Sequence, residues 1–336
     1  MVIAVGLTAV ACSGGDSSAS SSSSDVSTAA ATDGASTATD LQQAYVSAIH
    51  KASPSIVLIQ SGGRLGSGVI FDTRGDIVTN AHVVGRARRF LVTLASGARS
   101  GATVVGSFPP NDVAVIRIAH APAGLRPASF GDSSRLAVGD IVLAVGNPLG
   151  LRSSVTNGIV SALNRTVTEP TGAALPDVIQ TSAPINPGNS GGALVSLSGN
   201  VVGIPTLAAT DPQLGGGAAP GIGFAIPANT VHDLANQIIH HGHVVNSHRA
   251  FLGVELAAIT ARGVLVAAVQ PGGPAAKAGI TARDVITAIN GRPTPTVPIL
   301  QALMASMDPG QHVTVELITP SGATRSVGVT LGQLPG

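Results

Sequence analysis

Residues 185–194 read INPGNSGGAL, a stretch that sets Ser190 inside a frame of glycines. Glycine allows the backbone of such a turn to adopt conformations closed to other residues, so neighbouring N–H groups can face one side. A nucleophilic serine needs this setting, because its hydroxyl must stand beside N–H groups that can hold an oxyanion, here those of Gly188 and Ser190. Taken alone, GNSGG is equally compatible with an unreactive hairpin turn. The flanking sequence therefore decides.

Short β-branched runs separated by turns lie on both sides of this stretch. The first set is SIVLIQ, GSGVIF, GDIVTN, FLVTL, ATVVGSF and VAVIRI; the second is DIVLAVGN, SVTNGIVSAL, VIQTSA, GALVSL, NVVGIPTL and GIGFAIP. Their spacing is typical of antiparallel barrels. We therefore predict a mainly β fold with two barrels, at about residues 53–130 and 135–228, and a site in the cleft between them.

Two further segments differ from the barrel pattern. One helix is predicted over residues 41–52 and ends before Pro54. A second helix is predicted over residues 228–242 and ends at Gly242. From Phe251 onward, FLGVEL, GVLVAAV, PGGPAAKAGI, DVITAINGR, PILQALMASM, HVTVELIT and ATRSVGVTL form a β-rich stretch with one clear helix. About eighty residues are enough for this stretch to fold as a separate small domain.

Two more residues complete a candidate catalytic set. His82 lies in DIVTNAHVV, at the end of a predicted strand, and Asp112 lies in NDVAVIRI, at the start of another. A serine nucleophile needs a base of near-neutral pKa, and an acidic residue fixes the tautomer of that base. Each residue alone also fits a structural role, a packed histidine or a turn-capping aspartate. Their order, with base and acid in the first barrel and Ser190 in the second, favours a catalytic triad.

The composition excludes several other kinds of site. The net charge is +1, 10% of residues are charged and 2% are aromatic, so no nucleic-acid partner is expected. One cysteine, Cys12, rules out an internal disulfide. His240, His241, His243 and His248 lie at a helix end and linker without a neighbouring carboxylate, and we predict solvated histidines there rather than a zinc site. No metal and no cofactor are predicted.

The N-terminus indicates export. Residues 1–12, MVIAVGLTAVAC, resemble a bacterial lipoprotein signal in which Cys12 is lipidated, and residues 13–40 form a Ser/Ala/Gly/Thr-rich stretch predicted to be a disordered tether. A transmembrane anchor truncated at its start is the alternative, because the apolar run is too short to span a bilayer. Both interpretations place the remaining chain outside the cytoplasm, in the cell envelope or secreted. The first adds a lipid anchor at the outer face of the membrane.

At this point a family resemblance can be named. GSGVIF, TNAHVV, NDVAVIRI, AVGNPLGL, SVTNGIVSALNR, NPGNSGG and GIGFAIP together resemble the HtrA (DegP-type) family of trypsin-like serine proteases. The resemblance implies a chymotrypsin-like double six-stranded barrel, a protease domain over residues 41–242 and a PDZ domain, an α+β small barrel, over residues 250–332. It also implies a homotrimer built around residues 41–58.

The PDZ resemblance implies that Phe251, Leu252, Gly253 and Val254 form the loop that binds a peptide carboxylate. The function expected is then extracytoplasmic quality control: a serine endopeptidase that cleaves unfolded or damaged proteins and is regulated by peptide C-termini bound to the PDZ domain. A catalytically silent peptide-binding chaperone or scaffold is the alternative.

Three residues depart from the family pattern: Ser182 stands where the family usually has Asp, Pro184 where it has Ala, and Pro205 where Asn is common. All three flank the expected specificity pocket. The preference for small aliphatic side chains that the family implies is therefore less firmly predicted than the catalytic residues.

Overall fold

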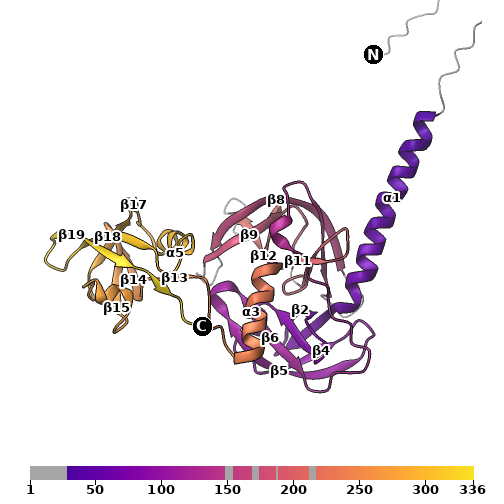
Figure 1. Cartoon of the computed structure of the whole chain (residues 1–336), viewed down its shortest axis with the longest axis horizontal. Coiled ribbons are helices and arrows are strands. Elements are labelled where there is room, and N and C mark those ends of the chain that lie inside the picture. The colour runs from indigo at the N-terminus through magenta and orange to yellow at the C-terminus, as the bar shows by residue number, and fades with distance from the viewer. Residues whose placement is uncertain (1–28, 148–153, 169–173, 187, 212–216) are drawn as a thin grey trace, which may run out of the picture. The chain divides into compact units, whose positions relative to one another are not determined.

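Twelve strands of the computed structural model form two closed antiparallel barrels (Figure 1). The model describes residues 29–147, 154–168, 174–186, 188–211 and 217–336. In the first barrel the strand order is β1-β2-β3-β6-β5-β4. Its strands are β1 (Ile56–Ser61), β2 (Arg64–Ile70), β3 (Asp76–Thr79), β4 (Arg89–Thr93), β5 (Arg99–Phe108) and β6 (Val113–Ile118).

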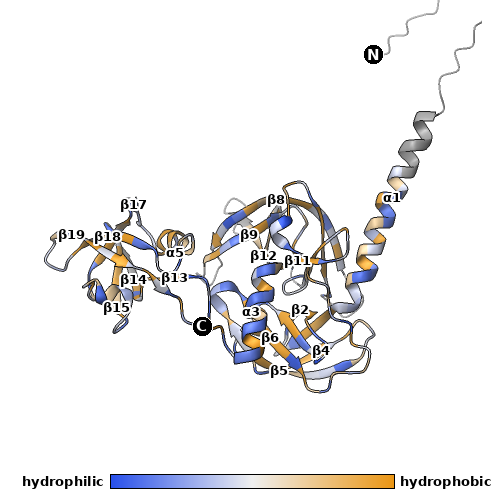
Figure 2. Cartoon of the chain, in the orientation of Figure 1, coloured by the Kyte–Doolittle hydropathy of each residue, from blue (hydrophilic) through white to orange (hydrophobic). Residues whose placement is uncertain are grey.

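The second barrel repeats the order of the first, with β10-β11-β12-β9-β8-β7. Its strands are β7 (Ile141–Gly146), β8 (Ser154–Thr168), β9 (Ala174–Thr181), β10 (Ala193–Ser196), β11 (Val201–Asp211) and β12 (Gly217–Pro227). The predicted fold class is thus confirmed. β-branched residues suit these strands because their stiff side chains pack well on a pleated surface, and apolar residues are concentrated along strands such as β4 and β6 (Figure 2).

One apolar cluster contains residues of both barrels and joins them. It contains Val69 and Val115 from the first barrel, Leu143 and Ile204 from the second, and Leu234 from α3 (Ala228–His241). All five side chains are essentially inaccessible to water. The barrels and α3 therefore share one hydrophobic core, which fixes the two halves of the cleft relative to each other.

Two local predictions were wrong. The first helix, α1, runs over Ala29–Ala52, so part of the segment predicted as a disordered tether is helical; its residues AAATDGASTATD are rich in alanine, the best helix former, and contain no proline. His82 does not end a strand but lies in the short helix α2 (Ala81–Val84), which follows β3 because Asn80 adopts an extended N-cap conformation. Residues 1–28, including Cys12, lie outside the described part of the chain.

The C-terminal unit is a small sheet with two helices. Its main sheet has the order β14-β15-β16-β18-β19, with β17 paired to β16, and β13 pairs with β20. The elements are β13 (Ala250–Phe251), β14 (Val254–Thr260), β15 (Gly263–Val269), α4 (Pro274–Lys277), β16 (Val285–Ile289), β17 (Arg292–Pro293), α5 (Val297–Ala305), β18 (His312–Ile318), β19 (Thr324–Thr330) and β20 (Gly332–Gln333). An apolar cluster of its own fills it.

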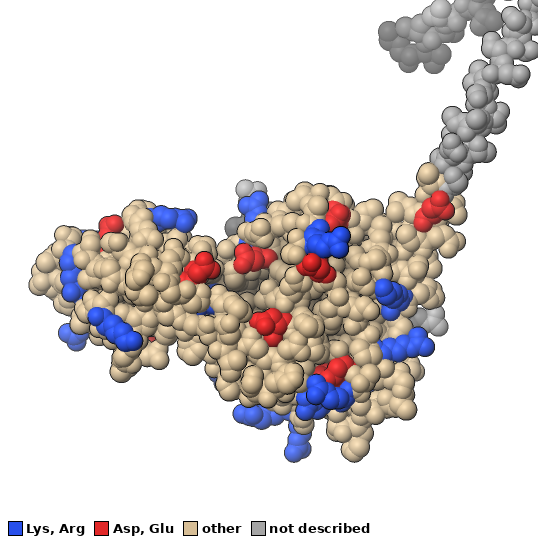
Figure 3. All heavy atoms as spheres, viewed as in Figure 1, with Lys and Arg blue, Asp and Glu red and all other residues tan. Residues whose placement is uncertain are grey.

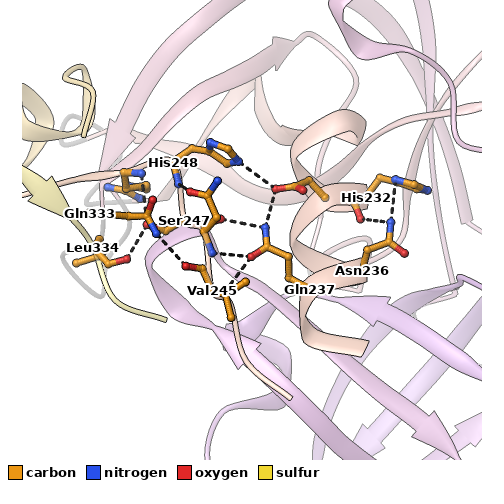
Figure 4. A network of polar contacts seen from close by, with 11 residues as sticks. His232, Asn236, Gln237, Val245, Ser247, His248, Gln333 and Leu334 are labelled. Atoms are coloured by element: carbon orange, nitrogen blue, oxygen red, sulfur yellow. Dashed lines mark hydrogen bonds and ion pairs between the residues drawn. The ribbon is translucent and has the colours of Figure 1, made fainter. Parts of the chain in front are cut away.

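The linker between α3 and β13 is held by side chains (Figure 4). The Gln237 side-chain oxygen accepts bonds from the backbone N–H groups of Val245, at 3.0 Å, and Asn246, at 2.7 Å. The Ser247 hydroxyl donates to the Leu334 carbonyl oxygen at 2.6 Å. No cluster of three or more potential metal ligands occurs among the described residues, and none of the helices placed there is long and apolar enough to cross a bilayer.

Substitution Leu234→Ala tests the shared core. The side chain is 1% exposed in the cluster that joins both barrels, so its truncation leaves a cavity and should destabilise the barrels by about 2–5 kcal/mol. Thermal denaturation followed by circular dichroism measures the change. His240→Ala, at an exposed position of the same helix, is the control and should stay within about 0.5 kcal/mol of the parent chain. Equal effects of the two substitutions would contradict a shared core.

Candidate active site

His82 and Asp112 are joined by two hydrogen bonds. The Nδ1 atom of His82 lies 2.8 Å from Oδ2 of Asp112, and the backbone N–H of His82 donates to Oδ1 at 2.9 Å. Because a carboxylate only accepts hydrogen bonds, Nδ1 carries the proton and Nε2 is left as the basic nitrogen. The His82 side chain is 36% exposed, whereas that of Asp112 is 2% exposed. The base therefore borders solvent and its partner does not.

Asp112 is positioned by a strained turn and three donors. It follows the 3₁₀ turn Pro109–Asn111 and adopts a left-handed backbone, with φ of 52°, directly before β6. Besides the two bonds from His82, its Oδ2 accepts a bond of 2.6 Å from the Thr206 hydroxyl of β11. The second barrel thus helps to hold the acidic residue of the first.

Ser190 lies in the turn between β9 and β10, beside two glycines with positive φ. Gly188 has φ of 105° and Gly191 has φ of 78°. A Cβ at Gly191 would meet the Ser67 carbonyl oxygen and the Thr79 hydroxyl. The Ser190 hydroxyl donates to the Thr206 carbonyl oxygen at 3.0 Å, and the Ser190 carbonyl oxygen accepts from the Ser67 N–H at 3.0 Å. No larger residue at position 191 would let the turn reach this place against the first barrel.

Three of the four predicted residues, His82, Gly188 and Ser190, line one cavity of about 510 Å³. Asp112 is not among its lining residues. The first barrel and α2 contribute Arg64, Leu65 and Val83 to its wall, and the second barrel contributes Ile185, Asn186, Leu207 and Ala208. Among these lining residues no carboxylate occurs, and the charged side chains on the face drawn in Figure 3 are scattered rather than gathered into one patch. The cavity suits an uncharged, apolar side chain.

The three residues that depart from the family pattern, Ser182, Pro184 and Pro205, all accept hydrogen bonds near this cavity. The Ser182 hydroxyl accepts a bond of 3.0 Å from the Ile159 N–H, which ties β9 to β8. The Pro184 carbonyl oxygen accepts a bond of 2.7 Å from the Thr156 hydroxyl. The Pro205 carbonyl oxygen accepts a bond of 3.0 Å from the Gly191 N–H. Two of the three therefore act through backbone groups that any residue provides.

Sequence reasoning missed two hydroxyl residues of the site, Thr206 and Ser67. Each lay within a quoted motif, VVGIPTL and GSGVIF, but neither was singled out. Their partners are 94 residues away, at Asp112, and 121 residues away, at Gly188. A hydroxyl residue between apolar neighbours in a strand is the only local signal.

The predicted carboxylate-binding residues surround a bend between β13 and β14. Gly253 has φ of 79°, and the Leu252 carbonyl oxygen accepts a bond of 2.9 Å from the Ala275 N–H at α4. The four residues from Phe251 to Val254 line a cavity together with Leu256 of β14 and with Leu300 and Met304 of α5. Leu256, Leu300 and Met304 give this part of the cavity wall an apolar character beside the bend.

Comparison with known proteins agrees with this geometry. Residues 66–204 match a trypsin-like peptidase domain model and residues 265–319 match a PDZ domain model. The chain is 42% identical over 279 residues to the periplasmic serine endoprotease DegP of Salmonella typhimurium. That alignment covers 80% of this chain and 57% of the relative. Serine protease PepD of Mycobacterium tuberculosis is 41% identical, over 84% of this chain and 65% of the relative.

The length of the match differs between relatives. This chain spans 57% of the DegP sequence, but it covers 99% of the solved chain of the HtrA-type protease AlgW with a bound decapeptide, at 32% identity and a TM-score of 0.60. That alignment includes 87% of the present chain, and hence both barrels and the C-terminal unit contribute to it. The chain belongs to the HtrA/DegP family of trypsin-like serine proteases with one C-terminal PDZ domain.

Proposed function

We propose that this chain is an extracytoplasmic serine endopeptidase of protein quality control, which cleaves unfolded or damaged proteins through an acyl-enzyme. The observation that carries the proposal is the placement of His82, paired to buried Asp112, in one cavity with Ser190 and Gly188. The periplasmic relatives support the compartment. Ser190 is the nucleophile, His82 the general base and Asp112 the residue that orients it.

The chemistry follows from these positions. The Ser190 oxygen attacks the carbonyl carbon of the scissile peptide bond, and its proton passes to Nε2 of His82. Because the Ser190 hydroxyl donates to the Thr206 carbonyl oxygen, it must first turn toward the imidazole. The N–H groups of Gly188 and Ser190 stabilise the oxyanion. His82 then protonates the leaving amine, and water repeats the sequence on the acyl-enzyme to release the acid and restore Ser190.

The pocket residues support a preference for small aliphatic side chains. Ile185 is 7% exposed and lies against Gly223 of β12, where a Cβ would collide with it. Leu207 and Ala208 complete this wall. A long basic side chain would lose its hydration in such a wall without gaining a carboxylate partner.

Substitution Ser190→Ala should abolish casein cleavage and leave the thermal unfolding curve unchanged, because the reacting oxygen is lost and a small residue replaces a small one. Asp112→Asn should lower kcat by about 10⁴-fold, since the imidazole then takes the wrong tautomer. A fluorophosphonate probe should label the parent chain and not Ser190→Ala. An unlabelled parent chain would instead favour the silent chaperone or scaffold.

Pocket shape predicts the effect of Ile185→Ala. This change removes side-chain atoms opposite Gly223 and so enlarges the pocket. The ratio of the kcat/KM value for Leu to that for Val at the cleaved position should rise by about 10-fold, because room for one methylene in a pocket changes kcat/KM by about 10–200-fold. Cleavage of a peptide library read by mass spectrometry measures the ratio. Val138→Ala removes an exposed side chain that does not line this cavity and serves as the control, whose Leu/Val ratio should equal that of the parent. An unchanged ratio in Ile185→Ala would contradict the pocket assignment.

The PDZ assignment predicts binding of peptide C-termini in the groove between β14 and α5. On the Ser190→Ala background, a peptide with a free carboxylate should bind at least about 10-fold more tightly than its amidated form, because backbone N–H groups of residues 251–254 would capture the charge. Isothermal titration calorimetry with both peptides gives the two Kd values. Equal affinities would refute the role of these four residues.

A further inference from the structure

The Ser67 hydroxyl lies at the junction of the two barrels, beside the nucleophile turn. Ser67 belongs to β2 of the first barrel, and its side chain is fully buried. We infer that this hydroxyl is a positioning group for the oxyanion-binding turn, on which the rate of acylation depends. The inference rests on the proposed protease function and adds to it a residue that does not touch substrate.

Both hydrogen-bonding capacities of the Ser67 oxygen are directed at the second barrel. It donates to the Gly188 carbonyl oxygen at 2.5 Å and accepts from the Asn147 backbone N–H at 2.8 Å. The Gly188 carbonyl lies in the turn between the two proposed oxyanion donors, the N–H groups of Gly188 and Ser190. A bond to this carbonyl therefore fixes the peptide plane between the donors, and hence the direction in which they point.

The backbone of Ser67 is held as firmly as its side chain. Its N–H donates to the Ser190 carbonyl oxygen at 3.0 Å, and its carbonyl oxygen accepts from the Thr79 hydroxyl at 2.7 Å. Thr79 is the last residue of β3, three positions before His82, and is also fully buried. The strand that leads to the base, the buried serine and the nucleophile turn are thus joined in one hydrogen-bonded chain.

The hydroxyl at this junction is buried. Asn147 is 5% exposed and Ser67 and Thr79 are 0% exposed, so a removed oxygen would leave the Gly188 carbonyl and the Asn147 N–H without this partner in a buried site. The turn would then relax toward other partners. Displacements of about 1 Å in a catalytic site cost about 10²-fold in rate, and loss of one oxyanion donor costs about 10²–10³-fold.

The test uses the full chain with Ser67→Ala and a peptide amide substrate. We expect kcat to fall by about 10- to 100-fold with KM within about threefold, because the loss concerns the transition state and not substrate binding. The inhibition constant of a peptide aldehyde, whose adduct places its oxygen in the oxyanion site, should rise by a similar factor. Full kcat in the folded variant would overturn the inference, as would an unchanged aldehyde inhibition constant.

Two further variants separate positioning from general stability. Ser247→Ala removes a buried hydroxyl that likewise bridges a carbonyl oxygen, of Leu334, and an N–H group, of Arg249, but lies in the linker (Figure 4). It should retain kcat within about threefold even where its melting temperature falls as much as that of Ser67→Ala. Ser67→Cys keeps the shape of the side chain with a slightly larger atom and a weaker donor, and should lose about 3- to 10-fold in kcat, between serine and alanine.

The outcomes also distinguish this inference from the protease assignment. If the parent chain neither cleaves substrate nor reacts with a fluorophosphonate, the proposed function fails. If the parent cleaves and folded Ser67→Cys cleaves equally fast, the protease assignment stands and the role of Ser67 is refuted, even where Ser67→Ala does not fold. Equal losses of kcat in Ser67→Ala and Ser247→Ala would likewise assign the effect to stability alone.

Discussion

Asp112 is 1% exposed, and the remaining site is arranged around its carboxylate. A buried polar group that loses its hydrogen-bond partners costs free energy, because water cannot replace them. Here three donors supply the partners: the His82 backbone and ring from α2, and the Thr206 hydroxyl from β11. Since these donors belong to different barrels, the carboxylate has all of these partners only when the barrels are correctly docked.

Buried hydroxyl groups lie within the apolar contact between the two barrels. The barrels and α3 meet through an aliphatic cluster that includes Val69, Leu143 and Leu234. Apolar packing has no direction and tolerates small shifts, whereas hydrogen bonds define which atom faces which. The buried hydroxyls of Ser67, Thr79 and Thr206 supply that direction. The apolar cluster thus holds the barrels together, whereas the buried hydroxyl groups set how the catalytic groups are oriented toward one another.

The sequence predicted what depends on local pattern and missed what depends on distant partners. Both barrels followed from β-branched runs, and the region around Ser190 from its glycines. The helical start of α1 at Ala29 was missed because Ser, Thr and Gly, which disfavour helices, alternate with the alanines of that stretch. The helix at His82 was missed because α2 has only four residues, too few to show a helical period. Thr206 and Ser67 could not be found, since their roles exist only once β11 and β2 face residues about a hundred positions away.

The unusual residues near the pocket can be reconciled with an intact site by the same distinction. Pro184 and Pro205 take part through carbonyl oxygens, which proline retains, and the N–H that proline lacks is not needed for these bonds. Ser182 accepts a bond from the Ile159 N–H, a role that a serine hydroxyl fulfils as well as a carboxylate would, but without a charge. Ser182 therefore adds no charge to this region of the chain, and Ile185, Leu207 and Ala208 form an apolar part of the cavity wall. The hydrogen bonds that orient Asp112 and His82 do not involve these three residues, and the nucleophile turn uses only the backbone carbonyl groups of Pro184 and Pro205.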